Sequence, residues 1–163
     1  MKFKTILLPK MILSNFLSQK KLLFSYILNL KVSFKHLRLL IFRVIRYHLQ
    51  DKEYEPVLTV LESQLAKGKP QLFYQYGPTL MQTISRRFVD SLMANGSILS
   101  PLKMIPSLLV NARVEQELEA VRYLEFCVDK LGSRDPPVHN YLLSLYIKHK
   151  PKEVWPYLQK FSG

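Results

Sequence analysis

The chain has 163 residues, of which 48% are hydrophobic, and it contains 24 Lys or Arg residues against 12 Asp or Glu residues. This length and apolar content suffice to bury a core, so the composition excludes an intrinsically disordered chain. The single cysteine, Cys127, excludes an intrachain disulfide and any zinc site built from several cysteines.

The net charge of +12 is concentrated at the amino-terminal end of the sequence. Residues 1–50 contain ten Lys or Arg and no acidic residue, whereas residues 51–163 contain 14 basic and 12 acidic residues, a net charge of +2. A nucleic-acid binder needs many basic side chains to neutralise phosphates, and this second part lacks such an excess. We therefore expect no nucleic acid among its partners, and a lone cysteine favours a reducing, cytosolic environment.

Residues 1–43 form a basic segment whose apolar stretches are interrupted by lysines. It contains neither the roughly 20 apolar residues of a membrane-spanning helix nor the cleavage site of a secretory signal. Its lack of acidic residues is also typical of a mitochondrial presequence or of a basic amphipathic helix lying on anionic lipid. Because the composition changes abruptly near Val44, we predict a poorly packed or non-native extension over residues 1–43 and a helical domain over residues 44–163.

After the basic segment, proline and glycine divide the sequence into stretches of the length of a short helix. The first predicted helix covers Tyr54 to Ala66, and Gly68 suits the turn that follows it. A short helix over Gln71 to Tyr76 is expected to stop at Gly77-Pro78, and a longer helix to run from Thr79 to Ala94. The predicted apolar stripe of the first helix consists of Val57, Leu58, Leu61 and Leu65. That of the longer helix consists of Leu80, Ile84, Phe88 and Leu92.

The next predicted helix begins at Ser100-Pro101, because the serine oxygen can accept a free amide hydrogen while proline has none to lose. We expect it to run towards Asn111 with a bend near Pro106. A further helix from Glu115 to Leu131 carries acidic residues in its first turns and has Gly132 as a left-handed cap. Its predicted core stripe is Leu118, Val121, Leu124, Val128 and Leu131.

Two more helices complete the predicted array. Asp135-Pro136 begins one helix, which buries Leu142, Leu145 and Tyr146 and ends at Lys150-Pro151. Val154 to Phe161 makes the last one. Each hairpin exposes an apolar face that only a neighbouring hairpin can cover. We therefore predict an all-α fold, an α-solenoid of stacked helical hairpins.

Two stretches of the sequence carry a resemblance to a known family: Ala120–Val128, which reads AVRYLEFCV, and His139–Tyr146, which reads HNYLLSLY. Both resemble the α-solenoid of the vacuolar protein sorting 18 family, whose members are core subunits of the HOPS and CORVET tethering complexes. The resemblance covers about Val44 to Gly163 and implies repeats of the clathrin heavy-chain type. Supporting stretches are Pro70–Tyr74, Val89-Asp90, Ile105-Pro106 and Val44–Leu61.

The resemblance implies a non-catalytic scaffold that acts in vesicle docking, membrane fusion and protein transport. Its partners would be other tethering-complex subunits, and it would lie peripherally on the cytoplasmic face of the late endosome, lysosome or vacuole. In this family a β-propeller precedes the solenoid and a zinc-binding RING-type domain follows it. We expect neither here, since one cysteine cannot build a RING zinc site.

Four residues are candidates for a protein interface: Arg86, Arg87, Trp155 and Tyr157. The two arginines suit an acidic partner, although adjacent charges on an amphipathic helix also form its solvated face. The two aromatic residues suit interface anchors, although core packing explains them equally well.

The sequence contains no phosphate-binding loop, metal-spaced cluster or nucleophile motif, so we predict no enzyme, cofactor, metal or small-molecule substrate. Cys127 lies beside Phe126 on an apolar helix and is expected to act as a small core residue. His139 lacks a second ligand at metal spacing, which predicts local hydrogen bonding, and His48 and His149 are equally isolated in the sequence.

The sequence offers one further residue group and two alternative functions. The alternating glutamates Glu115, Glu117 and Glu119 are better explained by the helix dipole than by acid–base catalysis. One alternative function is a helical-repeat RNA-binding module, which predicts salt-sensitive RNA binding. The other is a truncated gene product without independent activity.

Overall fold

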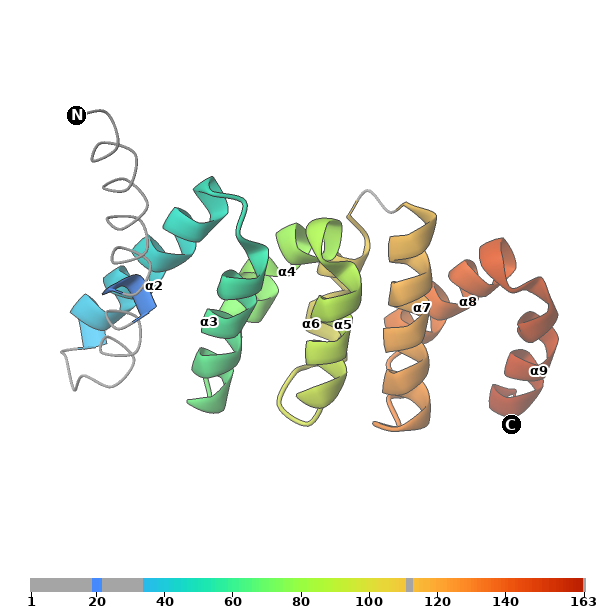
Figure 1. Cartoon of the computed structure of the whole chain (residues 1–163). Helices are drawn as coiled ribbons and strands as arrows, with labels where there is room; N and C mark the ends of the chain where they lie inside the picture. Colours follow the sequence, from blue (N-terminus) through green and yellow to red (C-terminus); the bar gives the residue numbers. More distant parts are fainter. Residues whose placement is uncertain (1–18, 22–33, 111–112, 163) are drawn as a thin grey trace, which may run out of the picture. The chain divides into compact units, whose positions relative to one another are not determined.

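The computed structural model of the chain describes residues 19–21, 34–110 and 113–162. These residues are predominantly helical and contain no strand, which confirms the predicted all-α class (Figure 1). The chain divides into two units, Met1–Tyr47 and His48–Gly163. The main helices are α2 (Phe34–Gln50), α3 (Tyr54–Ala66), α4 (Gln71–Thr83), α5 (Ser85–Ala94), α6 (Pro101–Leu108), α7 (Val114–Asp129), α8 (Pro136–His149) and α9 (Pro151–Phe161).

The described part of the first unit consists of residues 19–21 and most of α2. Ile41 and Ile45, one helical turn apart on α2, are both buried. Lys20 donates a hydrogen bond to the hydroxyl of Tyr47, and its ammonium lies 4.3 Å from the centroid of that ring. Most of the predicted extension lies outside the described residues, so its packing and its boundary near Val44 stay predictions.

None of the described helices combines the length and the hydropathy that crossing a bilayer requires.

The helices of the second unit form two layers. Helix α4 packs against α6 and α6 against α8, while α5 packs against α7. Each helix from α3 to α9 also contacts a chain neighbour in the other layer, as in the pairs α3 with α4 and α7 with α8. Figure 1 shows α3, α5 and α7 side by side in front of α4, α6 and α8. This arrangement is the predicted α-solenoid, because every hairpin covers the apolar face of the next.

The core of the second unit contains most residues of the predicted apolar stripes, although Ile84 of the second stripe is only half-buried. All four stripe residues of α3 are buried, and Gly68 has the left-handed φ of +73° that the turn after this helix requires. The rings of Phe73 and Phe88 stack with their centroids 6.1 Å apart, which joins α4 to α5. Full burial of one such large side chain stabilises the fold by about 1.5–3 kcal/mol.

Gly77-Pro78 does not end a helix, so the predicted boundary at this dipeptide is wrong. Helix α4 continues to Thr83, and the break falls at Ile84, which has a φ of −127° and a ψ of 48°. A single helix from Thr79 to Ala94 is therefore also wrong. The break re-aims α5 so that Phe88 reaches Phe73, and this tertiary packing outweighs the hydrogen bond lost at Pro78.

The predicted stripe of α7 is only partly correct. Leu118 is 43% exposed and Leu131 is 36% exposed, whereas the other three stripe residues are buried. Helix α7 contacts α5, α6 and α8, so the buried face is wider than one stripe and includes Tyr123 and Cys127. The helix also ends at Asp129, before the left-handed Gly132 with its φ of +64°.

The predicted starts of α6 and α8 are correct in position, but the predicted capping bonds are absent. Ser100 and Asp135 are N-caps with extended backbone and a proline directly after them, yet neither side chain forms a capping hydrogen bond. Proline in the first turn therefore sets these starts through its fixed φ. Helix α6 ends at Leu108 rather than near Asn111, and α9 begins at Pro151 rather than at Val154.

We predict that Gly77→Ala lowers the free energy of unfolding by about 1–2 kcal/mol, because overpacking outweighs the better helix propensity of alanine. A Cβ at Gly77 would lie 2.4 Å from Oγ and 2.9 Å from Cβ of Ser107, so α4 and α6 would have to separate. Urea unfolding followed by circular dichroism measures the loss. In a Ser107→Gly background, Gly77→Ala should lower the free energy of unfolding by less. An equal loss in both backgrounds would contradict a clash between the new Cβ and Ser107.

Candidate functional site

Charged side chains link consecutive helices of the front layer. In each link a basic residue reaches back to an acidic residue of the preceding front-layer helix, with separations of 2.7–3.6 Å between nitrogen and oxygen. The three pairs are Arg87 of α5 with Glu62 of α3, Arg122 of α7 with Asp90 of α5, and Lys160 of α9 with Asp129 of α7. We call this series the ion-pair ladder.

Arg122 is the most highly connected member of the ladder. Its Nη1 donates to Asp90 at 2.7 Å, its Nε donates to Glu119 at 2.8 Å, and its Nη2 donates to the carbonyl oxygen of Arg86 at 3.2 Å. A planar guanidinium with several donors can satisfy all three acceptors at once, which an ammonium cannot. Glu119 therefore serves to orient Arg122.

The two candidate arginines have different environments. Arg87 is about half exposed and contacts both Glu55 and Glu62 on α3, each at 3.6 Å, so it contributes to helix packing. The side chain of Arg86 is exposed and forms no ion pair within the described part of the chain, while its carbonyl oxygen accepts from Arg122. A role in binding another protein stays a prediction for both.

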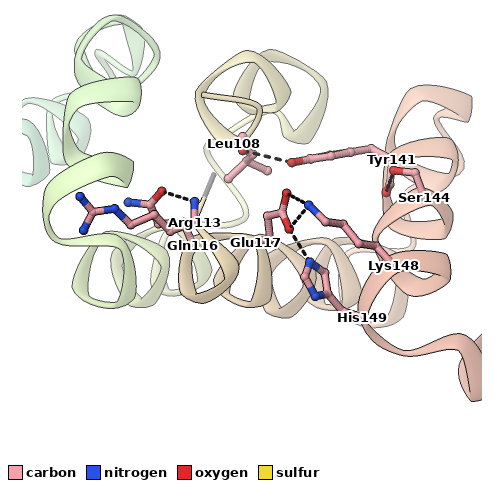
Figure 2. A network of polar contacts seen from close by, with 8 residues as sticks. All are labelled: Leu108, Arg113, Gln116, Glu117, Tyr141, Ser144, Lys148 and His149. Atoms are coloured by element: carbon pink, nitrogen blue, oxygen red, sulfur yellow. Dashed lines mark hydrogen bonds and ion pairs between the residues drawn. The ribbon is translucent and has the colours of Figure 1, made fainter. Parts of the chain in front are cut away.

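A second polar network surrounds the first turns of α7 (Figure 2). Glu117 accepts a hydrogen bond from Nζ of Lys148 at 2.8 Å and pairs with Nε2 of His149, both from the end of α8. The side chains of Glu117 and His149 are 12% and 11% exposed. These partners, Lys148 first and His149 second, hold the pKa of Glu117 below its ordinary value of 4.5.

The same network reaches the back layer. Gln116 donates from Nε2 to the carbonyl oxygen of Gln82 on α4 at 2.9 Å and accepts from the amide of Arg113 at 3.0 Å. The hydroxyl of Tyr141 on α8 donates to the carbonyl oxygen of Leu108 on α6 at 3.1 Å. Side-chain hydrogen bonds therefore fix the start of α7 against α4 and α8, and a further bond joins α8 to α6.

No pattern in the sequence predicted this network. Glu115 and Glu117 lie in the first turn of α7, as the dipole interpretation predicts, but Glu117 also has partners more than thirty positions away. His149 is isolated only in the sequence, and His48 pairs with Glu53 at 2.6 Å. Only the stacking of α8 on α7 brings Glu117 and His149 together, so no local sequence signal identifies the pair.

The candidate aromatic residues of α9 lie on different faces. Tyr157 is half-buried, and its ring packs edge-on to Tyr146 and against Phe161, with centroids 5.4 Å and 4.9 Å away. Burial raises the pKa of Tyr157 to about 12, and its hydroxyl pairs with Nδ1 of His139. Trp155 is 67% exposed, so of the two it is the one available to a partner.

His139 and Cys127 have structural surroundings. Nε2 of His139 lies 2.9 Å from the carbonyl oxygen of Ser133, and with the Tyr157 contact this confirms the predicted local hydrogen bonding. Cys127 is buried, and desolvation raises the pKa of its thiol to about 11. The thiol is therefore protonated at neutral pH and is a poor nucleophile.

A groove of about 200 Å³ lies between α7, α8 and α9. Its walls include Glu125, Asp129, Tyr146 and Tyr157. Glu125 pairs with Lys150 at 3.0 Å, and Asp129 pairs with a ladder lysine, so these two carboxylates already have partners within the chain. Among the described residues, no three His, Cys, Asp or Glu side chains are grouped so as to hold a metal ion.

Comparison with known proteins gives a consistent result. Residues 42–163 match the family described as "VPS18, alpha-solenoid domain, second half". The zebrafish (Danio rerio) vacuolar protein sorting-associated protein 18 homolog is 39% identical over 121 residues, which cover 72% of this chain and 12% of that protein. The Drosophila melanogaster protein of the same name is 39% identical over 99 residues, or 61% of this chain and 10% of the relative.

A plant relative extends the comparison. Vacuolar sorting protein 18 of Arabidopsis thaliana is 35% identical over 112 residues, which cover 66% of this chain and 11% of that protein. The chain therefore spans about a tenth of the length of the curated relatives that it matches. No solved structure matches the chain.

We predict that Glu117→Gln lowers the free energy of unfolding by about 1–2 kcal/mol at neutral pH, since the ammonium of Lys148 and the ring of His149 both lose the carboxylate as a partner. The pKa of Glu117 is lowered in the folded state, so its ionised carboxylate stabilises the fold. This stabilisation is fully present above the ordinary pKa of 4.5 and is lost as the pH falls through the lower pKa of the folded state. Urea unfolding at several pH values should show the two proteins converging in acid.

The matched control for this test is Glu115→Gln, an exposed first-turn position without an ion pair among the described residues. It should change stability by less than about 0.5 kcal/mol. A pH-independent difference between the Glu117 variant and the wild type would contradict the assigned ion pair.

We also predict that Arg122→Lys costs about 0.5–1 kcal/mol, because an ammonium cannot serve Asp90, Glu119 and the Arg86 carbonyl together. Arg134→Lys, at an exposed residue without an ion pair in the described part of the chain, is the control and should be neutral. Thermal unfolding measures both. Asp90→Asn should then lower the free energy of unfolding by less in the Arg122→Lys background than in the wild type. An equal loss in both backgrounds would contradict the ion pair between Arg122 and Asp90.

Proposed function

Because the chain belongs to the family of vacuolar protein sorting 18 α-solenoids, we propose that it is a scaffold segment of an endosomal or lysosomal (vacuolar) membrane-tethering complex. The observation that carries this proposal is the match of residues 42–163, which contain the whole helical stack from α3 to α9. A segment of this kind acts without catalysis, by holding other subunits at fixed positions during vesicle docking, fusion and intracellular protein transport.

The contacts of the second unit suit such a role. Each helix from α4 to α8 is packed against neighbours in both layers, and the ion-pair ladder and the Glu117 network fix the register between hairpins. A load applied to one hairpin is therefore passed to the next through packed side chains rather than through a flexible linker.

The proposed partners are the other subunits of HOPS- or CORVET-type tethering complexes. The proposed location is the cytoplasmic face of the late endosome, lysosome or vacuole, where the chain would lie peripherally through its complex. Trp155 is the contact residue that the structure favours most, since it is a large aromatic side chain that is 67% exposed.

The test is co-purification of tethering subunits with the tagged full chain from cells. We expect Trp155→Ala to lower the recovered subunits by roughly tenfold or more, as truncation of an aromatic anchor does. The control is Ile147→Ala, which removes an aliphatic side chain of similar exposure, 63%, from α8 and should leave recovery unchanged. Recovery of no tethering subunit by the wild-type chain would reject the scaffold, and salt-sensitive recovery of RNA instead would favour the RNA-binding alternative.

A further inference from the structure

The turns that join the two layers of the second unit line up along one edge. The α3–α4, α5–α6 and α7–α8 connections all lie at the bottom of Figure 1. The amide of Ser100 donates to the hydroxyl of Tyr74 at 2.9 Å, which joins the starts of α6 and α4. A Cβ at Gly96 would lie 2.7 Å from the ring of Phe126, which places the α5–α6 turn against the end of α7.

We define the basic edge as residues 67–70, 95–103 and 130–135. It contains five Lys or Arg and a single acidic residue, Asp135. The opposite edge, residues 51–55, 82–87, 113–115 and 148–153, contains seven basic and five acidic residues. The net charge of +2 for residues 51–163 therefore conceals an edge with a net charge of +4.

Four of the five basic residues of the basic edge, Lys67, Lys103, Lys130 and Arg134, are exposed. Of these, Lys130 and Arg134 form no ion pair with any described residue. Nζ of Lys103 lies 5.8 Å from the centroid of the Tyr74 ring, within the range of a cation–π contact. The neighbouring acid Asp129 is compensated by Lys160 at 2.7 Å.

Aliphatic side chains are exposed between these charges. Ile98 is 48% exposed, Leu102 is 46% exposed and Leu131 is 36% exposed. They come from the α5–α6 turn, the first turn of α6 and the α7–α8 turn. The basic edge therefore presents apolar groups and positive charges together, at the tips of convex turns.

From this combination we propose that the basic edge binds directly to a membrane surface that contains acidic lipids. Lysine and arginine are attracted to acidic headgroups, and aliphatic side chains gain from entering the boundary between headgroups and acyl chains. RNA would use the charges but not the aliphatic groups, and it binds through exposed aromatic faces. The aromatic residue at this edge, Tyr74, is half-buried; its ring faces the ammonium of Lys103 and its hydroxyl accepts from the amide of Ser100.

This proposal goes beyond the scaffold function and does not rest on it. A scaffold reaches the membrane through the other subunits of its complex, whereas the basic edge would touch the lipid itself. Such a contact would fix the orientation of the stack, with the turns α3–α4, α5–α6 and α7–α8 facing the bilayer.

The first test is flotation of the full chain with vesicles of phosphatidylcholine and phosphatidylserine, compared with vesicles of phosphatidylcholine alone. We expect Lys130→Glu with Arg134→Glu to weaken binding to the acidic vesicles by roughly tenfold or more, given about fivefold per basic residue. The control pair, Lys52→Glu with Lys152→Glu, changes the net charge equally on the opposite edge and should change binding by less than about twofold. Residues 1–50 are the same in all these proteins, so their charge cancels in the comparison.

The second test reports apolar contact. Ile98→Cys and, on the opposite edge, Val114→Cys are each labelled with a nitrobenzoxadiazole dye; the native Cys127 is buried and escapes labelling. Acidic vesicles should shift the emission of the dye at position 98 to the blue and leave the dye at position 114 unchanged. Equal loss of binding in both charge pairs, or no shift at position 98, would overturn the proposal. If Lys130→Glu with Arg134→Glu abolished binding to single-stranded RNA but left vesicle binding unchanged, the membrane proposal would be overturned in favour of nucleic acid.

Discussion

The structure depends on the burial of apolar side chains between successive helices. A helix such as α3 carries Val57, Leu61 and Leu65 on one face and gains stability only when α4 covers them. The covering helix has a second face of its own, which the next hairpin covers in turn. Residues buried in this way include Phe73 of α4 and Phe88 of α5, and helix α9, which packs on α8, has no fully buried residue.

Polar contacts add register to this packing more than they add stability. The ladder pairs are partly exposed, so each contributes no more than about 1 kcal/mol. Their value is geometric, because Arg122 reaches its acceptors on α5 only when α7 lies at one position along it. The Glu117 pair is more enclosed and connects the first turn of α7 to the last turn of α8. Together these contacts hold α7 in register with α5 and α8.

The distribution of charge matters more for this chain than its total. Opposite charges lie opposite one another in the ladder and the Glu117 network, and the turns at one edge carry four lysines and one arginine with a single aspartate among them. The two proposed functions use different features of the chain: the stack of packed helices is proposed to hold subunits, and the basic edge is proposed to meet a membrane surface.

The sequence by itself determined the all-helical class, the extent of α3, the starts of α6 and α8, and the family. These features depend on periodic apolar residues and on proline and glycine, which act within a few residues of chain. Tertiary structure decided the continuation of α4 through Pro78, the break at Ile84 and the exposure of Leu118. It also decided that His149 meets Glu117 and that three separate turns form one basic edge. Each of these depends on which helix lies beside which, and a stacking of hairpins brings together residues about thirty positions apart that no local pattern connects.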